Sequence, residues 1–180
     1  FNKINAPQKK YENISFLNYT ADHDRLLLPT SQGLLVYNAE NQAENPLQEF
    51  TAFNGFFTDK VIQIVAINSN NELFISVNGY GVYHLDAQYQ LVHHYFDEIQ
   101  QAKIVHILSN KHTLWMSSER GIIEIDTNTK QAHLYSSEVY ENYMKLMQCA
   151  YNDASGQLYF GGNKGFIHFN PDIQTSEVRY

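Results

Sequence analysis

The sequence has little cysteine, proline or tryptophan: its 180 residues include one Cys, four Pro and one Trp. A single cysteine, Cys149, excludes an intrachain disulfide, and without a cluster of cysteines we expect no structural zinc. The thiol lies in the apolar run LMQCA, which favours a buried and unreactive side chain. No apolar run reaches the length of about 18 residues that a membrane-spanning helix needs.

Basic residues are also few. Twelve Lys and Arg stand against 19 Asp and Glu, which gives a formal net charge of −7. Nucleic acid and anionic membrane surfaces attract proteins through a field of Lys and Arg, which this composition does not supply. We therefore expect neither to be a direct partner of these residues. The chain begins with Phe1 rather than Met, and we expect that upstream sequence has been removed.

Aromatic residues, by contrast, are plentiful: 13 Tyr and 11 Phe help to bring the aromatic share to 14%, in a chain that is 43% hydrophobic. This composition is sufficient for a packed core. Tyr and Phe favour pleated, half-buried surfaces. No segment carries a convincing apolar stripe at helical spacing, so the sequence favours β structure.

The strongest pattern is a unit repeated four times, in which a Leu-led apolar strand, a short polar turn, a Gly and a second apolar strand follow one another. Its lead residues are Leu26, Leu73, Leu114 and Leu158, and its turn glycines are Gly33, Gly81, Gly121 and Gly165. Successive turn glycines are 48, 40 and 44 residues apart. A period in this range is typical of an array of identical supersecondary units.

Each unit divides into four short segments rich in β-branched and aromatic residues; in the second unit they are 61–67, 72–77, 81–86 and 91–95. Their apolar residues fall on both strand faces, whereas a β-sandwich would leave one face polar. The sequence therefore predicts an all-β fold of about four β-propeller blades, each with four antiparallel strands. We place the blades at 14–53, 61–95, 104–135 and 146–180, with 1–13 as a linker or the end of a preceding blade, all in one propeller domain.

Two segments resemble the two-component-regulator propeller repeat: LWMSSERGIIEIDTNTKQAHLY (114–135) and LYFGGNKGFIHFNPD (158–172). The resemblance implies the periplasmic sensor region of a bacterial membrane protein, whose output module is a histidine kinase or a diguanylate cyclase. It also implies a non-catalytic role in sensing a small molecule, often an oligosaccharide. The membrane would then be reached only through a domain outside these residues.

The resemblance further implies a propeller of about seven blades, more than the four units found here. We therefore expect an arc of a larger propeller, in which neighbouring blades or a second protomer cover the end faces. A compact four-bladed ring is the alternative.

No arrangement of residues predicts an enzyme, a metal or a cofactor. His93 and His94 are adjacent on a strand, so their side chains point to opposite faces and are not expected to share one ion. The GGNKG segment (161–165) lacks the Lys-Ser/Thr pair and the following helix of a phosphate-binding loop. The segment Asp22-His23-Asp24 has side chains suited to a metal ion but fits a hairpin turn better.

Two surfaces are candidates for ligand binding. The first is a set of polar side chains at one register of every innermost strand: Ser15, Gln63, His106 and Gln148. Such a ring near the propeller axis could hold water or the polar end of a ligand. Alternatively, each side chain bridges the backbones of neighbouring blades.

The second surface consists of the turns between the second and third strands, whose chemistry varies while the flanking strands keep their pattern. The predicted contacts in these turns are Asn78, Tyr80, Glu119, Arg120, Asn163 and Lys164. Tyr80 supplies a stacking plane for a sugar ring, and the longer loops at 54–60 and 136–145 add aromatic side chains to the same face. Ordinary solvated turns would look the same.

The alternative functions are a lyase or hydrolase of the streptogramin-lyase type and a protein-binding propeller.

Overall fold

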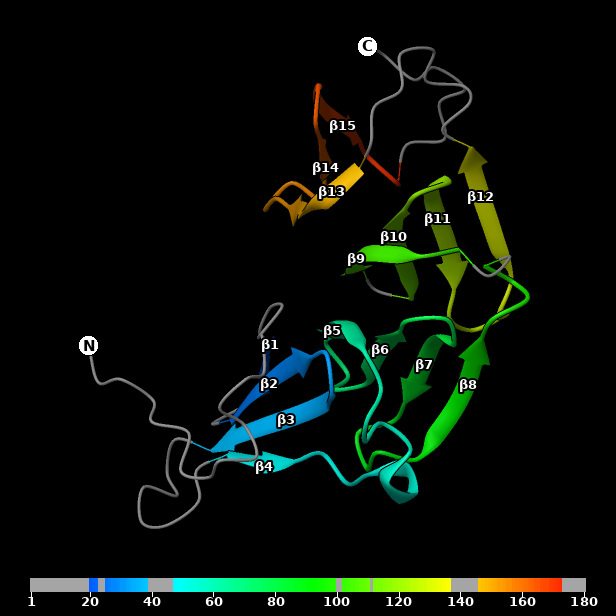
Figure 1. Cartoon of the computed structure of the whole chain (residues 1–180). Coiled ribbons are helices and arrows are strands. Elements are labelled where there is room, and N and C mark those ends of the chain that lie inside the picture. The colour runs from blue at the N-terminus through cyan, green and yellow to red at the C-terminus, as the bar shows by residue number, and fades with distance from the viewer. Residues whose placement is uncertain are drawn as a thin grey trace. The chain divides into compact units, whose positions relative to one another are not determined.

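The computed structural model describes residues 20–22, 25–38, 47–99, 102–110, 112–136 and 146–172. Within these residues every regular element is a β-strand, except the short 3-10 turn η2 (Phe53–Gly55). The strands form four antiparallel sheets, each of which is one unit of the repeat (Figure 1). The predicted all-β fold of propeller-type blades is thereby confirmed.

The blades have the following strands. Blade 1 consists of β1 (Thr20–Asp22), β2 (Arg25–Thr30), β3 (Gly33–Asn38) and β4 (Leu47–Glu49). Blade 2 consists of β5 (Ile62–Ile67), β6 (Leu73–Val77), β7 (Gly81–Leu85) and β8 (Leu91–Tyr95). Blade 3 consists of β9 (Ile104–Asn110), β10 (Thr113–Ser118), β11 (Gly121–Asp126) and β12 (Ala132–Ser136). Blade 4 consists of β13 (Leu146–Asn152), β14 (Leu158–Gly162) and β15 (Gly165–Phe169).

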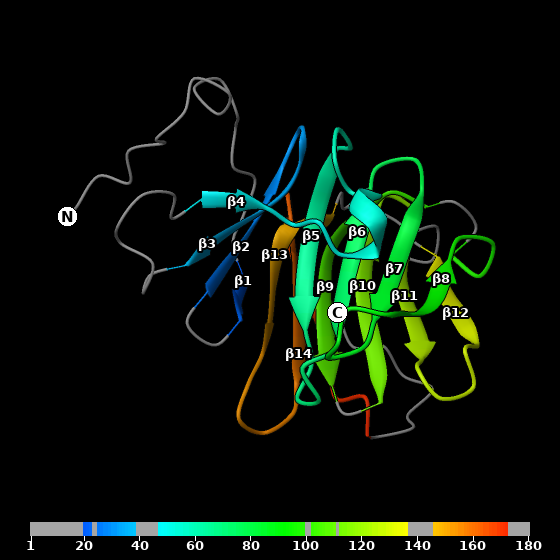
Figure 2. The same cartoon turned by 90° about the horizontal axis from the view of Figure 1, so that it is seen from below.

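Within each blade the strands pair in chain order, so every ladder joins strands that are neighbours in the sequence. In Figure 2 the four strands of blade 2 follow one another in this order, from β5 to β8. Pairing between sequence neighbours closes only short loops, which keeps the entropic cost of forming each sheet low.

The repeated Gly is required by the turn between the second and third strands. Its φ is positive in every blade, +130° at Gly33, +81° at Gly81, +132° at Gly121 and +147° at Gly165, where a side chain would be strained. In blades 1 and 3 a buried hydroxyl closes this turn. The hydroxyl of Thr30 donates to the Gly33 carbonyl at 2.6 Å, and that of Ser118 donates to the Gly121 carbonyl at 2.9 Å.

The chain divides into two compact units, Phe1–His94 and Tyr95–Tyr180, and each has its own core. The core of the first unit includes Leu27, Leu34, Phe50, Phe57, Ile62, Leu73, Ile75, Tyr83 and Leu85. The core of the second unit includes Trp115, Ile122, Leu146, Leu158, Phe160 and Ile167. Every residue of β6 and β7 is buried.

Cys149 does not follow the prediction from its apolar run. Its thiol is exposed on β13, so the expectation of a buried side chain is wrong. The side chain lies over Gly161 of the neighbouring strand, where an added Cβ would come within 2.1 Å of the Cys149 Sγ. The missing side chain at Gly161 makes room for the thiol on a face of blade 4 that solvent reaches.

Candidate functional site

The loop that joins blade 1 to blade 2 has an unusual backbone. The φ angle is positive at Phe53 (+56°), Asn54 (+54°) and Asp59 (+58°). Residues with a side chain rarely adopt this region, and such outliers gather where a structure holds a functional site. The N–H of Gly55 donates to the Thr51 carbonyl at 3.0 Å, which closes the first turn of the loop.

Backbone hydrogen bonds join two hairpin turns to this loop and to Val61, the residue that follows it. The N–H of Asp59 donates to the carbonyl of Gln32, in the β2–β3 turn, at 3.1 Å. At the far end of the loop the N–H of Asn78, in the β6–β7 turn, donates to the Val61 carbonyl at 2.9 Å. The structure thus brings the predicted recognition turns of blades 1 and 2 together with the loop at 54–60.

Five aromatic rings gather where the loop meets the β6–β7 turn: Phe53, Phe56, Phe57, Tyr80 and Tyr83. The Phe56 ring contacts the other four, with centroids 4.8 to 6.2 Å apart. Phe57 is fully buried, whereas Tyr80 is 49% exposed. The cluster therefore presents the ring of Tyr80 to solvent from a packed aromatic support.

Lys60 places a positive charge on this surface. Its Nζ lies 4.4 Å from the centroid of the Phe56 ring and 5.4 Å from that of Tyr80. An ammonium group near aromatic faces is held by their quadrupoles. A ligand that stacks on Tyr80 would therefore meet a charged hydrogen-bond donor beside the ring.

His94 supports the turn that carries Tyr80. Its ring stacks on Tyr83 with centroids 4.1 Å apart and planes at 16°, and its Nε2 lies 2.5 Å from the Tyr80 carbonyl oxygen. Burial, assisted by the nearby Tyr80, raises the pKa of Tyr83. The backbone of Tyr80 is therefore fixed from the strands beneath it.

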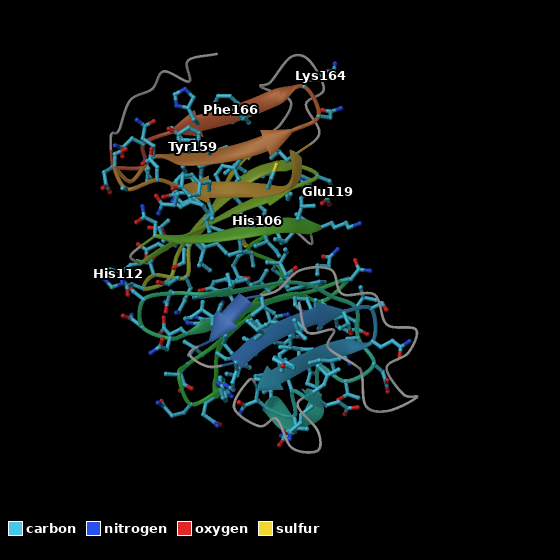
Figure 3. The ribbon with its side chains drawn as sticks, turned by 90° about the vertical axis from the view of Figure 1, so that its left-hand side faces the viewer. His106, His112, Glu119, Tyr159, Lys164 and Phe166 are labelled. Carbon is cyan, nitrogen blue, oxygen red and sulfur yellow. The ribbon has the colours of Figure 1, made fainter. Side chains whose placement is uncertain are left out.

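The other predicted turn residues lie in the second unit. Glu119 and Arg120 occupy the β10–β11 turn, and Asn163 and Lys164 occupy the β14–β15 turn; all four are exposed. Figure 3 shows Glu119 and Lys164 at the same end of the strands of this unit. The Glu119 carboxylate accepts the N–H of Lys103 at 2.7 Å. The ligand-binding role of these four residues stays a prediction.

The predicted polar register of the innermost strands is described at two of its four positions. Gln63, on β5, is 9% exposed, and its side-chain oxygen accepts the Ser76 hydroxyl at 3.5 Å, a bridge inside blade 2. His106, on β9, is half-buried; burial lowers its pKa, and its Nδ1 has no hydrogen-bond partner within the described residues. The side chain of Gln148 and the whole of Ser15 lie outside the described residues.

Sequence reasoning missed the roles of Lys60 and His94. The predicted loop at 54–60 contains Lys60, but nothing in its spacing shows which rings the ammonium meets. The sequence shows that His94 lies on a strand beside His93, but not that its ring stacks on Tyr83. Across the part of the chain that the structure describes, no three His, Cys, Asp or Glu side chains form a metal site, and no helix could cross a membrane. His23, Asp24 and most of the loop at 136–145 lie outside that part.

Comparisons with known proteins define the fold class further. No protein-family model and no curated protein matches the sequence. Among solved structures, the chain is similar to the extracellular domain of BT4673, a proposed one-component system of B. thetaiotaomicron. The TM-score is 0.65 at 12% identity, over 88% of this chain and 21% of that one.

Two further structures share the fold. One is the extracellular domain of BT3049, a proposed hybrid two-component system of B. thetaiotaomicron, with a TM-score of 0.53 and 18% identity over 96% of this chain and 30% of that one. The other is YCF48 bound to D1 peptide, with a TM-score of 0.67 and 10% identity over 90% of this chain and 52% of that one. The chain thus spans 21% to 30% of the two extracellular domains. Identities this low establish a shared fold.

Proposed function

We propose that the chain is a non-catalytic, ligand-binding part of the periplasmic sensor region of a bacterial membrane signalling protein. We call Phe56, Lys60, Asn78 and Tyr80 the Tyr80 surface and propose it as the binding site. The observation that carries this proposal is the half-exposed Tyr80 ring, which is in edge contact with the half-buried Phe56 ring and has an ammonium group beside it. The fold shared with two extracellular domains of proposed signalling systems supports the sensor role.

The chemistry of the Tyr80 surface favours an oligosaccharide with carboxylate groups. An aromatic face accepts the apolar face of a sugar ring, and a few convergent polar groups fix its orientation. Lys60 can pair with a sugar carboxylate, and the amide of Asn78 can bond hydroxyl groups. Because the net charge of −7 repels anions at long range, binding of an acidic sugar would depend on Lys60.

The Tyr80 surface also suggests how binding could be transmitted. Its residues come from the loop after blade 1 and from the β6–β7 turn of blade 2, so one ligand would contact both blades. A ligand that binds one arrangement of blades more tightly shifts the population toward it. The output chemistry, a histidine kinase or a diguanylate cyclase, would belong to another domain.

Calorimetric titration of the 180-residue chain tests the binding site. Tetragalacturonate and neutral cellotetraose serve as the probes. We expect tetragalacturonate to bind, and we expect Tyr80→Ala to weaken its affinity at least about tenfold, which corresponds to 1.4 kcal/mol. Lys60→Met should weaken the affinity for tetragalacturonate but leave the affinity for cellotetraose unchanged. Tyr135→Ala, at a ring that is 40% exposed on blade 3, is the matched control and should bind as the parent does.

Three results would contradict the proposal. If neither sugar binds, or if Tyr80→Ala binds as well as the parent, the Tyr80 surface is not the site. If chromatography shows the sugars shortened after incubation, and His106→Ala abolishes the shortening, the lyase alternative gains support and the non-catalytic role fails.

A further inference from the structure

Blade 3 has two buried polar atoms at facing positions of its first two strands. His106 on β9 is the register partner of Ser117 on β10, so the two side chains project from the same face of the sheet. Ser117 is 0% exposed, and among the described residues neither its Oγ nor the Nδ1 of His106 has a hydrogen-bond partner. Because a buried polar atom without a partner destabilises the folded state, the pair requires a specific explanation.

The face that carries this pair is turned toward blade 4. Trp115 lies two residues before Ser117 on β10, and it belongs to the same core as Leu158 and Phe160 of blade 4. Alternate residues of a strand share a face, so Ser117 and His106 point toward the same blade. In Figure 3 the labelled His106 lies on β9. The two polar atoms therefore lie beside an apolar core.

Blade 2 shows how the repeat satisfies the same hydroxyl. Ser76 and Ser117 each stand one residue before the end of the second strand of their blade. In both blades the first strand has a β-bulge close to this position, at Gln63 in blade 2 and at Val105 in blade 3. Gln63 accepts the Ser76 hydroxyl at 3.5 Å. Val105 has no polar side-chain atom, so blade 3 lacks the amide that serves this hydroxyl in blade 2.

Blade 4 brings no side chain from Gly162 to this part of the interface. Gly162 lies two residues after Phe160 on β14, so it is on the side of blade 4 that faces blade 3. Its register partner Leu146 is in one core with Ile122, which is the register partner of Ser117. The glycine at this position thus neither bonds nor covers the polar pair.

The groups themselves indicate which molecule they bind. Burial lowers the pKa of His106 and so favours the neutral imidazole, which has one donor and one acceptor nitrogen. A hydroxyl both donates and accepts, as water does, so water matches the pair whichever tautomer the imidazole adopts. An ion beside this apolar core would carry a charge without a counter-ion, which is far more costly. The pair therefore favours a small, neutral molecule.

We propose that Ser117 and His106 together hold a single buried water molecule, which bridges the Ser117 hydroxyl and the His106 imidazole between blades 3 and 4. The water takes the place of the amide that Gln63 supplies in blade 2. Waters of this kind bond polar groups that would otherwise lack a partner, and they are costly to remove. The site is independent of the Tyr80 surface, which lies in the other unit.

Oxygen-17 relaxation dispersion of the 180-residue chain tests the site, because it counts the water molecules that stay inside a protein. Ser117→Ala removes the hydroxyl and should lower the count by one relative to the parent. Val105→Gln places in blade 3 the amide that blade 2 has, and it should lower the count by one as well. His106→Phe, which removes the other partner, should have the same effect.

The matched control is Ser76→Ala. It removes the hydroxyl at the same repeat position of blade 2, where Gln63 already supplies the partner, so the count should not fall. Circular dichroism should show that all four variants keep the β structure of the parent. Should Ser117→Ala fail to fold, Val105→Gln answers the same question without removing a native polar group.

Either of two results would overturn the proposal. One is an equal count in the parent and in Ser117→Ala or Val105→Gln. The amide of Gln148, whose side chain lies outside the described residues, would then be the candidate partner of the pair. The other is an equal fall in Ser76→Ala, which would show that the lost water does not depend on the missing amide of blade 3. The measurement uses no sugar, so its outcome is separate from the effect of Tyr80→Ala on binding.

Discussion

At the scale of the residue, the stability of the first unit depends on rings that solvent does not reach. Phe57 is fully buried, and its ring centroid lies 5.4 to 6.1 Å from those of Phe50, Phe53, Phe56 and Tyr83. Phe57→Ala should lower the free energy of unfolding by about 3–5 kcal/mol, because it leaves a cavity as well as removing apolar contact. Urea denaturation measures the change.

The matched control is Phe166→Ala, which removes a ring of the same size at a 64% exposed position. We expect it to change the free energy of unfolding by no more than about 0.5 kcal/mol. Similar losses at both positions would contradict the difference in burial.

A second effect at this scale concerns pH. Burial lowers the pKa of His106 from its ordinary value of 6.5, so the folded chain holds a neutral imidazole. The unfolded chain binds a proton once the pH falls below that ordinary value, which favours unfolding. The contribution of His106 to stability is therefore complete above that pH and is lost as the solution becomes more acidic.

His106→Gln should make stability less dependent on pH in this window. The measurement is urea denaturation near pH 7.5 and near pH 5.5, where we expect the parent to lose more free energy of unfolding than the variant. If the two chains lose the same amount, groups other than His106 determine the acid sensitivity.

At the scale of the element, the β2–β3 turn and the loop that carries Phe57 form one piece. Gly33 has a φ of +130°, and a Cβ there would lie 3.0 Å from the Phe57 carbonyl oxygen. Gly33→Ala should therefore cost about 1–3 kcal/mol through backbone strain, and the close contact should displace the loop. Gly79→Ala is the control, because its φ is +76° but no atom lies within 4 Å of the added Cβ.

We expect Gly33→Ala to destabilise more than Gly79→Ala in thermal denaturation. Because the loop carries Lys60 and Phe56, Gly33→Ala should also weaken the binding of any ligand to the Tyr80 surface. A larger loss of stability from Gly79→Ala would show that the close contact at Gly33 does not determine the cost of the substitution.

Among the elements, the strands can be predicted from the sequence, whereas the backbone of the loop after blade 1 and the exposure of Cys149 cannot. The strands follow from the period of the repeat and from its turn glycines, since both are local in sequence. The positive φ of Phe53 occurs in a loop where its ring packs against Tyr83 of β7, a contact distant in sequence that no local pattern reveals. Cys149 was predicted incorrectly for a related reason: an apolar run shows that a strand packs, but not which of its two faces has a neighbour.

At the scale of the whole molecule, the described residues form two compact units, each with a hydrophobic core. All ladders in the described residues join sequence neighbours, and the two cores share no residue. When interactions are this local, the stability of a repeat array is close to a sum of terms from each repeat and its neighbours. Loss of one core should then open one unit before the other.

Hydrogen exchange followed by mass spectrometry tests this division, with Phe57→Ala in the first unit and Phe160→Ala in the second. Both side chains are 0% exposed, so the two variants remove equal rings from equally buried sites. We expect Phe57→Ala to speed exchange in β2–β7 and Phe160→Ala to speed it in β9–β15, because local opening requires less free energy than global unfolding. If either variant instead speeds exchange equally in both units, the chain opens as one cooperative body. The two cores would then not unfold independently of each other.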